Sequence, residues 1–461
     1  MLKFVIQKDC AEMRINMEQP IFTREDLKKL IIPLIIEQML ALSIGLFDTL
    51  MVSSCGEASV SGVSLVDSIS VLLIQILSAL ATGGAVVCSQ YLGKKMPEKA
   101  KLSAGQLMFI MLTSSGTVMI LVLFLHRFLL RTIFGQIEAD VMDAAQIYFL
   151  ISAISYPFLG VYNAGAALFR SIGNSKISMY TSLVMNVINI GGNAILIYGA
   201  GIGVMGAALA TLIARMVSAL VMVVLLSKKD NPLCIATPGC MRPQKDVIGK
   251  ILKIGIPSGI ENSMFQVGKL MVVSMITSFG TAAIAANSVS YSIIEFPNIP
   301  GMSMGLALIT VVETCLGAGE VAQAKKYTKK LMLFAYLGDW IMNLVLFVFA
   351  VPIVSVFSLS PEATRMAAEV LRWFSTIAVF IWPLSFTLPN ALRAAGDVKF
   401  TMLTGIISMW LFRVLCSYLL AVVCNMGILG VWFGMFIDWA VRSLLFAVRY
   451  LSGRWQMKKV I

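Results

Sequence analysis

The chain has 461 residues, 58% hydrophobic and only 13% charged, with a net charge of +12 and a mean hydropathy of +0.87. A water-soluble protein with so few charges could not cover its own surface, so lipid must solvate much of this chain. No large polar region is left over, which excludes a soluble enzyme domain.

Apolar segments recur along the whole chain, each about as long as the 20 or so residues that cross a bilayer core. We expect two of the spans to break, the second at Gly83-Gly84 and the eighth at Pro297 and Pro300. The hydropathy pattern predicts twelve spans: 30–54, 58–92, 102–126, 139–169, 177–200, 205–227, 250–278, 282–316, 331–355, 361–392, 400–424 and 429–450.

Basic residues follow a pattern along the predicted topology. Of the 36 Lys and Arg residues, 28 fall in the two termini, the central linker and the loops on the same side of the membrane as the termini. The positive-inside rule therefore predicts a plasma-membrane protein with both termini in the cytoplasm. This placement explains the high net charge without nucleic acid as a partner. The opposite side carries only Arg127, Arg131, Arg365 and Arg372.

The two halves of the chain repeat at a shift of 224 residues, which aligns Pro33 with Pro257 and Glu37 with Glu261. Because each half has six spans, the repeats are parallel and relate by an axis along the membrane normal. We expect an all-α integral membrane protein whose twelve helices form two six-helix lobes related by pseudo-two-fold symmetry. The expected segments are a cytoplasmic N-terminal segment (1–29), an N-lobe (30–227), a cytoplasmic linker (228–249), a C-lobe (250–450) and a cytoplasmic tail (451–461).

Several motifs resemble those of the multidrug and toxic compound extrusion (MATE) family over nearly the whole chain. They are the segment 47–52 around Asp48, the segment 90–93 at the end of the second span, the loop with Arg170 and Gly173, its repeat with Arg393 and Gly396, and Asn189-x-x-x-Asn193. The resemblance implies two lobes and alternating access. It also implies export of drugs or other organic cations, driven by an inward flow of protons or sodium ions.

Asp48 lies in the outer half of the first predicted span. Burying an isolated carboxylate in a membrane is costly, so Asp48 must be protonated, paired or exposed to a water-filled cavity. Glu37 precedes it by close to three helical turns, which places both carboxylates on one face. The resemblance gives Asp48 the role of the coupling acid. The alternative is a structural hydrogen bond between helices.

Asn189 and Asn193 stand one helical turn apart on the fifth predicted span. An amide oxygen beside a carboxylate can hold a sodium ion, and an amide N–H can stabilise a titrating Asp. The family uses such a pair beside the first-helix acid. Hydrogen bonding between helices is the alternative role. The predicted cation-coupling set is therefore Asp48, Asn189, Asn193 and Glu37.

The second half carries different intramembrane charges. Glu261 and Lys269 lie two turns apart, so each needs a partner on another helix. Glu295 precedes Pro297, where a broken helix exposes carbonyl groups to a cation or substrate. Neutralisation of Lys269 by a facing carboxylate is the alternative. One family branch has an acid in the tenth span where this chain has Trp382-Pro383, so a sodium site built on that acid is not expected here.

Arg413, Asp438 and Arg442 are predicted to form a buried network, with Asp438 and Arg442 as an i, i+4 ion pair on the twelfth span. The network is either static or broken during gating. Together with Glu261, Lys269 and Glu295, these residues are the candidate cavity or gating set of the C-lobe.

The resemblance implies a cation-coupled antiporter that exports small organic, often cationic, compounds. We expect it to work as a monomer without cofactor or bound metal. A single histidine, His126, and the absence of a Walker-type loop argue against an enzyme or an ATP-driven pump. A flippase for lipid-linked precursors is one alternative, although it would have more spans and a strongly cationic cavity. A non-transporting membrane receptor or scaffold is the other.

Overall fold

The computed structural model describes residues 20–135, 138–235, 239–357 and 359–457, and every regular element within these ranges is a helix. Eleven helical stretches in this part of the chain are long and apolar enough to cross a membrane. The remaining predicted span is α8 (Lys245–Ile276), which has 32 residues but also carries Glu261 and Lys269. The chain is thus a multi-pass membrane protein. Most of the expected N-terminal segment 1–29 and the end of the tail 451–461 lie outside the described residues.

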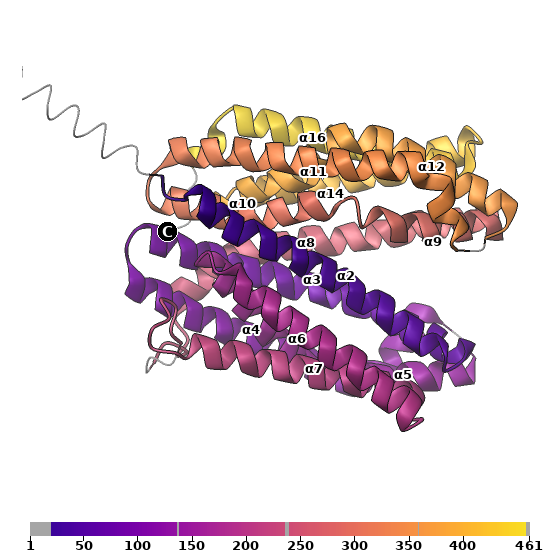
Figure 1. The fold of residues 1–461 in the computed structure, drawn as a ribbon, viewed down its shortest axis with the longest axis horizontal. Helices are drawn as coiled ribbons and strands as arrows, with labels where there is room; N and C mark the ends of the chain where they lie inside the picture. Colours follow the sequence, from indigo (N-terminus) through magenta and orange to yellow (C-terminus); the bar gives the residue numbers. More distant parts are fainter. Residues whose placement is uncertain (1–19, 136–137, 236–238, 358, 458–461) are drawn as a thin grey trace, which may run out of the picture.

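The helices form two bundles that lie one above the other in Figure 1. The N-lobe consists of α2 (Arg24–Ser53), α3 (Glu57–Gly93), α4 (Pro97–Phe134), α5 (Ala139–Ser171), α6 (Ser175–Asn193), the π-helix η1 (Ala194–Gly199) and α7 (Gly203–Leu226).

The C-lobe begins with α8 and repeats the plan of the N-lobe with more interruptions. Its further elements are η2 (Thr277–Phe279), α9 (Thr281–Ile294), α10 (Ile299–Gly317), α11 (Val321–Ser355), α12 (Pro361–Trp382), η3 (Pro383–Thr387), α13 (Leu388–Ala394), α14 (Val398–Ser408), η4 (Met409–Val414), α15 (Leu415–Tyr418), η5 (Leu419–Val423) and α16 (Gly427–Leu451), followed by η6 (Arg454–Met457).

Helix α2 belongs to both lobes. Its first half places Leu27, Leu30 and Leu34 in an apolar core with residues of α10 and α11, while α2 also packs against α6 in the N-lobe. The residues before α2 are tied to the C-lobe too, because the Phe22 N–H donates to the Tyr327 hydroxyl over 3.2 Å, and this hydroxyl donates to the Phe22 carbonyl over 2.8 Å. The first helix therefore contacts both lobes and connects them.

The structure confirms one of the two predicted helix breaks. Helix α9 ends at Ile294 and α10 begins at Ile299, so the eighth span is interrupted beside Pro297. The break predicted at Gly83-Gly84 is wrong, since α3 runs without interruption from Glu57 to Gly93. These two glycines serve close packing instead: a Cβ on Gly83 would lie 2.8 Å from the Gly255 nitrogen, and a Cβ on Gly84 would meet the Leu107 side chain.

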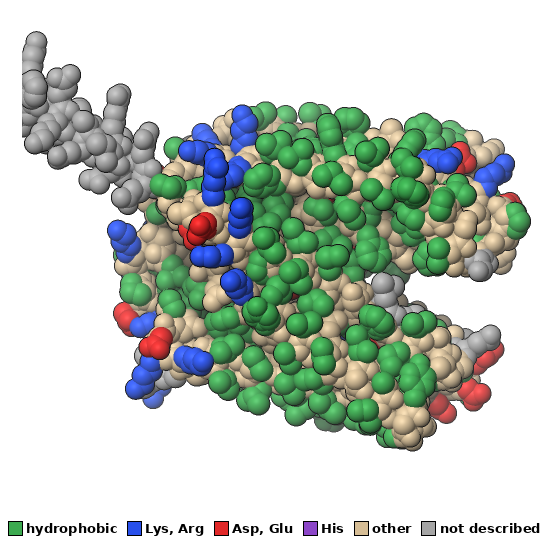
Figure 2. Space-filling view, in the orientation of Figure 1, with side chains coloured by type: hydrophobic (Ala, Val, Ile, Leu, Met, Phe, Trp, Pro, Cys, Tyr) green, Lys and Arg blue, Asp and Glu red, His purple; other side chains and the backbone are tan. Residues whose placement is uncertain are grey.

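The lobes touch at one end of the molecule and part at the other. Basic side chains gather at the end where α2 begins, which we call the basic end, and a cleft opens between the lobes at the opposite end (Figure 2). Near the basic end α3 crosses α10 so closely that a Cβ on Gly93 would lie 2.5 Å from the Thr314 carbonyl oxygen, and one on Gly317 would meet the Gln90 backbone. Only glycine allows backbones to approach this closely.

Candidate transport site

Asp48 lies half-buried near the C-terminal end of α2 and faces the amides of α6. The Asn193 side chain donates to the Asp48 carboxylate over 2.5 Å, and Asn189 also lies within hydrogen-bonding reach of it. Asn189 in turn donates to the Thr211 hydroxyl over 3.0 Å. The structure thus brings together three members of the predicted coupling set: Asp48, Asn189 and Asn193.

The side-chain oxygens of the asparagines in this region are not used within the described part of the chain. The Oδ1 atoms of Asn186, Asn189 and Asn193 are buried without a hydrogen-bond partner there. Buried amide oxygens normally find a donor, so a set of unused ones beside a carboxylate is unusual. Carboxylate and amide oxygens are also the ligands that hard cations prefer.

A second carboxylate, Asp67 on α3, stands close enough to Asp48 for the two charges to interact. The Tyr148 hydroxyl of α5 donates to Asp67 over 3.4 Å. Arg215 on α7 acts electrostatically on both carboxylates while its guanidinium donates to Ser155 over 2.6 Å. Neither Asp67 nor Arg215 was among the predicted site residues, because nothing in a chain pattern shows that α3 and α7 face the same space as α2.

Glu37 has a different environment from Asp48, although the two share a helix. Its carboxylate accepts from Arg170 over 2.9 Å and from the Ser178 hydroxyl over 2.7 Å. The structure therefore does not bring Glu37 to the Asp48 cluster, with which it was grouped on helical spacing alone. Its partner instead comes from the Arg170 loop, a motif that the sequence had singled out independently.

The C-lobe repeats this ion pair. Arg393 donates to Glu261 over 2.8 Å, and these two residues are the repeat counterparts of Arg170 and Glu37. Each arginine is the last but one residue of its helix, and a glycine three residues later lies in the left-handed region, Gly173 with φ +76° and Gly396 with φ +85°. Glycine accepts this backbone at no steric cost, which explains why both loops have it at the same place.

Within the described residues Lys269 forms no ion pair with a carboxylate, which was one of the two arrangements that the sequence left open. Its ammonium group lies 5.5 Å from the centre of the Tyr291 ring. The hydroxyl of the same tyrosine accepts from Arg413 over 2.9 Å. A cation–π contact and a hydrogen bond thus gather two positive charges on one aromatic side chain.

The predicted ion pair between Asp438 and Arg442 is not formed within the described residues. Asp438 accepts from the Ser408 hydroxyl instead, and Arg442 approaches Glu261 at 3.9 Å. Arg442 and Arg413 both lie against the Phe265 ring, 5.5 and 5.2 Å from its centre. The i, i+4 prediction failed because side chains from α8 and α14 offer these two residues closer partners than their own helix does.

Glu295 lies at the break in the eighth span, and an acid of a neighbouring helix caps the helix that follows the break. Glu295 directly follows α9 and is half-buried. The buried Asp339 of α11 accepts from the Gly301 N–H over 3.0 Å, in the first turn of α10. An acid at a helix N-terminus satisfies an otherwise unpaired N–H and complements the helix dipole. This role of Asp339 leaves no signal in the sequence, since its partner is 38 residues away.

Glu313 of α10 was not among the predicted site residues either. It is fully buried beside Ser89 of the N-lobe, whose hydroxyl donates to the Ser171 carbonyl over 2.9 Å instead, so that neither carboxylate oxygen of Glu313 has a hydrogen-bond partner in the described structure. Hydrogen bonds between the lobes surround it: Gln90 donates to the Ala394 carbonyl over 3.1 Å, and Thr310 donates to the Arg170 carbonyl over 3.2 Å. A fully buried acid therefore lies between the two lobes near the basic end.

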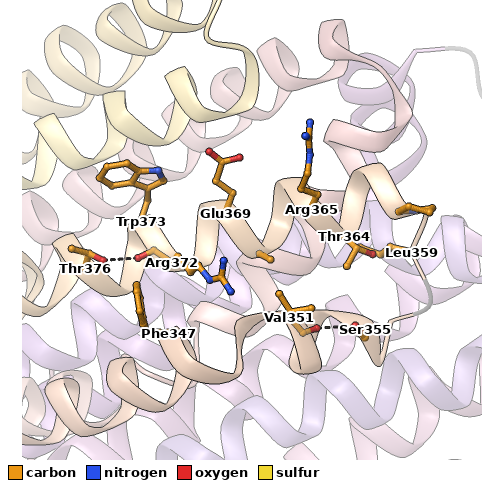
Figure 3. A pocket seen from close by; sticks show the side chains of 12 residues that line it. Phe347, Val351, Ser355, Leu359, Thr364, Arg365, Glu369, Arg372, Trp373 and Thr376 are labelled. Carbon is orange, nitrogen blue, oxygen red and sulfur yellow. Dashed lines mark hydrogen bonds between the residues drawn. The ribbon is translucent and has the colours of Figure 1, made fainter.

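A groove of about 1090 Å³ on the C-lobe is separate from all of these groups. It runs between α11 and α12, and Figure 3 shows the side chains of Phe347, Arg365, Arg372 and Trp373 along it. No N-lobe residue lines this groove. It therefore lies apart from the space between the lobes.

The comparisons with known proteins agree with this architecture. A family model described as MatE matches residues 33–195 and again residues 257–419, so the two matches reproduce the repeat. The uncharacterized transporter YisQ of Bacillus subtilis (strain 168) is 27% identical, covering 96% of this chain and 99% of its own. A probable multidrug resistance protein NorM of Thermotoga maritima is 24% identical, covering 95% and 94%.

A solved structure described as the outward-facing conformation of a multidrug resistance MATE family transporter of the MOP superfamily has the same fold. It superposes with a TM-score of 0.86 at 20% identity, covering 94% of this chain and 96% of that one. The expected two-lobed fold is confirmed, and members of the matched family are transporters of small molecules rather than enzymes. The chain belongs to the MatE family of multidrug and toxic compound extrusion transporters.

Proposed function

We propose that this protein is a cation-coupled antiporter that exports drugs or other small organic compounds, with Asp48 as the coupling site. The observation that carries the proposal is the position of Asp48: a half-buried carboxylate inside a membrane-spanning lobe, hydrogen-bonded to Asn193 and near unused amide oxygens. The names of the relatives, several of them multidrug resistance proteins, support the substrate class.

The arrangement suits reversible binding of one cation. A proton on Asp48 would cancel its charge, while a sodium ion would be coordinated by the carboxylate and by oxygens of Asn189 and Asn193. In either case the electrostatic interaction of Asp48 with Asp67 and Arg215 changes. Binding would thereby alter how α2 packs against α3, α6 and α7.

Alternating access fits the contrast between the two ends of the molecule. If the basic end is cytoplasmic, the conformation here is open to the outside and closed inside by the glycine crossing of α3 and α10 (Figure 2). Opening the basic end requires α3 and α10 to separate. One charge that moves inward across 100 mV supplies about 2.3 kcal/mol for this cycle.

The test is transport of a fluorescent organic cation by purified protein in liposomes, with pH and sodium gradients imposed separately. We expect one of the two gradients to drive uphill movement of the compound. The flippase alternative would show neither response but would move lipid-linked precursors between leaflets. Equal flux with and without both gradients would refute cation coupling.

A further inference from the structure

A small pocket lies inside the C-lobe between α8, η3, α13, α14 and α16. Its volume is about 130 Å³, and its lining includes Glu261, Phe265, Ser385, Arg393 and Arg442. This volume is below the range of drug-sized sites and corresponds to about four water molecules. The pocket can thus hold a small ion or a single functional group, but no whole drug.

Hydrogen-bond donors without partners surround this pocket. Arg442 is only 4% exposed, yet its Nε and Nη1 atoms have no partner within the described residues. The same holds for Arg393 Nε and for the fully buried Ser385 hydroxyl. Among the lining residues the unpaired buried atoms are thus four donors against one acceptor, Glu261 Oε2. Because buried donors are normally paired, this excess of donors points to an occupant that accepts several hydrogen bonds.

The net charge of the groups around the pocket favours an anion over water. Arg442 interacts electrostatically with two guanidinium groups, Arg393 and Arg413, and with two carboxylates, Glu261 and Asp438. Counting Arg442 itself, positive groups exceed negative ones by one. Water can satisfy the donors, but only an anion also offsets the surplus charge in a buried site.

The backbone of the pocket is unusual as well. Ser385 and Phe386 lie in η3, a π-helical turn that follows Pro383, whereas an α-helix would direct these side chains differently. Such turns occur frequently at functional sites. Ser385 and Phe386 both line the pocket from this turn, and the centre of the Phe386 ring lies 4.9 Å from the Arg442 guanidinium.

We propose that this pocket is a binding site for one small monovalent anion, a halide or a carboxylate group, held by Arg442, Arg393 and Ser385. The site is independent of the coupling role of Asp48, which lies in the other lobe. Two sources have this chemistry: free anions such as chloride, and the carboxylate of a transported compound.

The test uses the full-length protein in detergent at constant ionic strength, with the bulky 2-(N-morpholino)ethanesulfonate as the reference anion. Sodium bromide or sodium acetate replaces it stepwise while the melting temperature is recorded. We expect a saturable rise, because a ligand that binds only the folded state stabilises it. A response to both anions identifies a general small-anion site, and a response to acetate alone identifies a carboxylate site.

Three variants keep the test decisive. Arg442→Met should abolish the response, and Ser385→Ala, which retains every charge, should weaken the apparent affinity about tenfold through one lost hydrogen bond. Arg365→Met is the matched control, because this arginine lines the separate groove of Figure 3, and its response should equal that of the unmodified protein. No rise with either anion, or an undiminished rise in both Arg442→Met and Ser385→Ala, would overturn the proposal.

Discussion

The two lobes share a helical plan and one ion pair, yet they enclose opposite charges. In the N-lobe, Asp48 and Asp67 outnumber Arg215. In the C-lobe, arginines from three elements surround Glu261 and Asp438. Duplication has therefore preserved the framework while the interior chemistry diverged.

The repeat shows where this divergence lies. At the shift of 224 residues, Asp48 corresponds to Val272 and Asp67 corresponds to Tyr291, so neither acid of the N-lobe has an acidic counterpart. Glu37 and Glu261, by contrast, keep both their identity and their arginine partner. Positions that hold helices together are alike in the two lobes, whereas positions suited to ions differ.

The largest effect is expected from removing the charge at Asp48. Asp48→Asn should fold, because the amide still hydrogen-bonds to Asn193, but gradient-driven efflux in everted vesicles should fall to the background of vesicles without transporter. Val272→Asn at the matching position of the C-lobe is the control and should transport. Undiminished efflux by Asp48→Asn would show that cation coupling does not depend on this acid of the N-lobe.

The shared ion pairs should matter equally in both lobes. Arg170→Met or Arg393→Met removes the nearest positive charge from a buried carboxylate, which should lower the free energy of unfolding by about 3–5 kcal/mol. Denaturant titration in detergent measures this loss. Adding Glu37→Gln to Arg170→Met, or Glu261→Gln to Arg393→Met, should restore much of it. A large loss in only one lobe would contradict a common structural role.

The glycine crossing at the basic end should tolerate no side chain on either partner. Gly93→Val and Gly317→Val should each cost about 1–3 kcal/mol through overpacking and should slow transport, because α3 and α10 can no longer close. Gly116→Val on α4 is the control, since a Cβ there meets nothing within 4 Å. Transport rates and melting temperatures like those of this control would show that the crossing is not needed for closure.

The smallest effect is expected at Glu313, whose N-lobe counterpart is Ser89. Glu313→Gln removes an ionisable group from a fully buried position, so the melting temperature should rise slightly, by an amount worth about 1 kcal/mol. Glu98→Gln, an exposed acid on α4, should change it less. Marked destabilisation by Glu313→Gln would mean that the carboxylate has a partner that only an acid can satisfy.

Part of the candidate site could be predicted from the sequence alone. A carboxylate and two amides inside apolar segments are conspicuous because polar groups are rare there, which marked Asp48, Asn189 and Asn193. Glu37 was grouped with them because helical spacing predicts which face of the helix a residue occupies. The spacing does not predict which neighbouring side chains contact that face. Its partner Arg170 lies 133 residues away along the chain.

The sequence by itself determined the membrane class, the spans and the parallel repeat. Hydropathy and segment length decide directly which segments are stable in a bilayer, and the repeat is visible in the spacing of residues along the chain. Only the tertiary structure decided which polar groups meet, where α3 crosses α8 and α10, and that Gly83-Gly84 packs rather than breaks a helix. These outcomes depend on the approach of helices that are distant in sequence, and packing between them assigns each buried charge its partner.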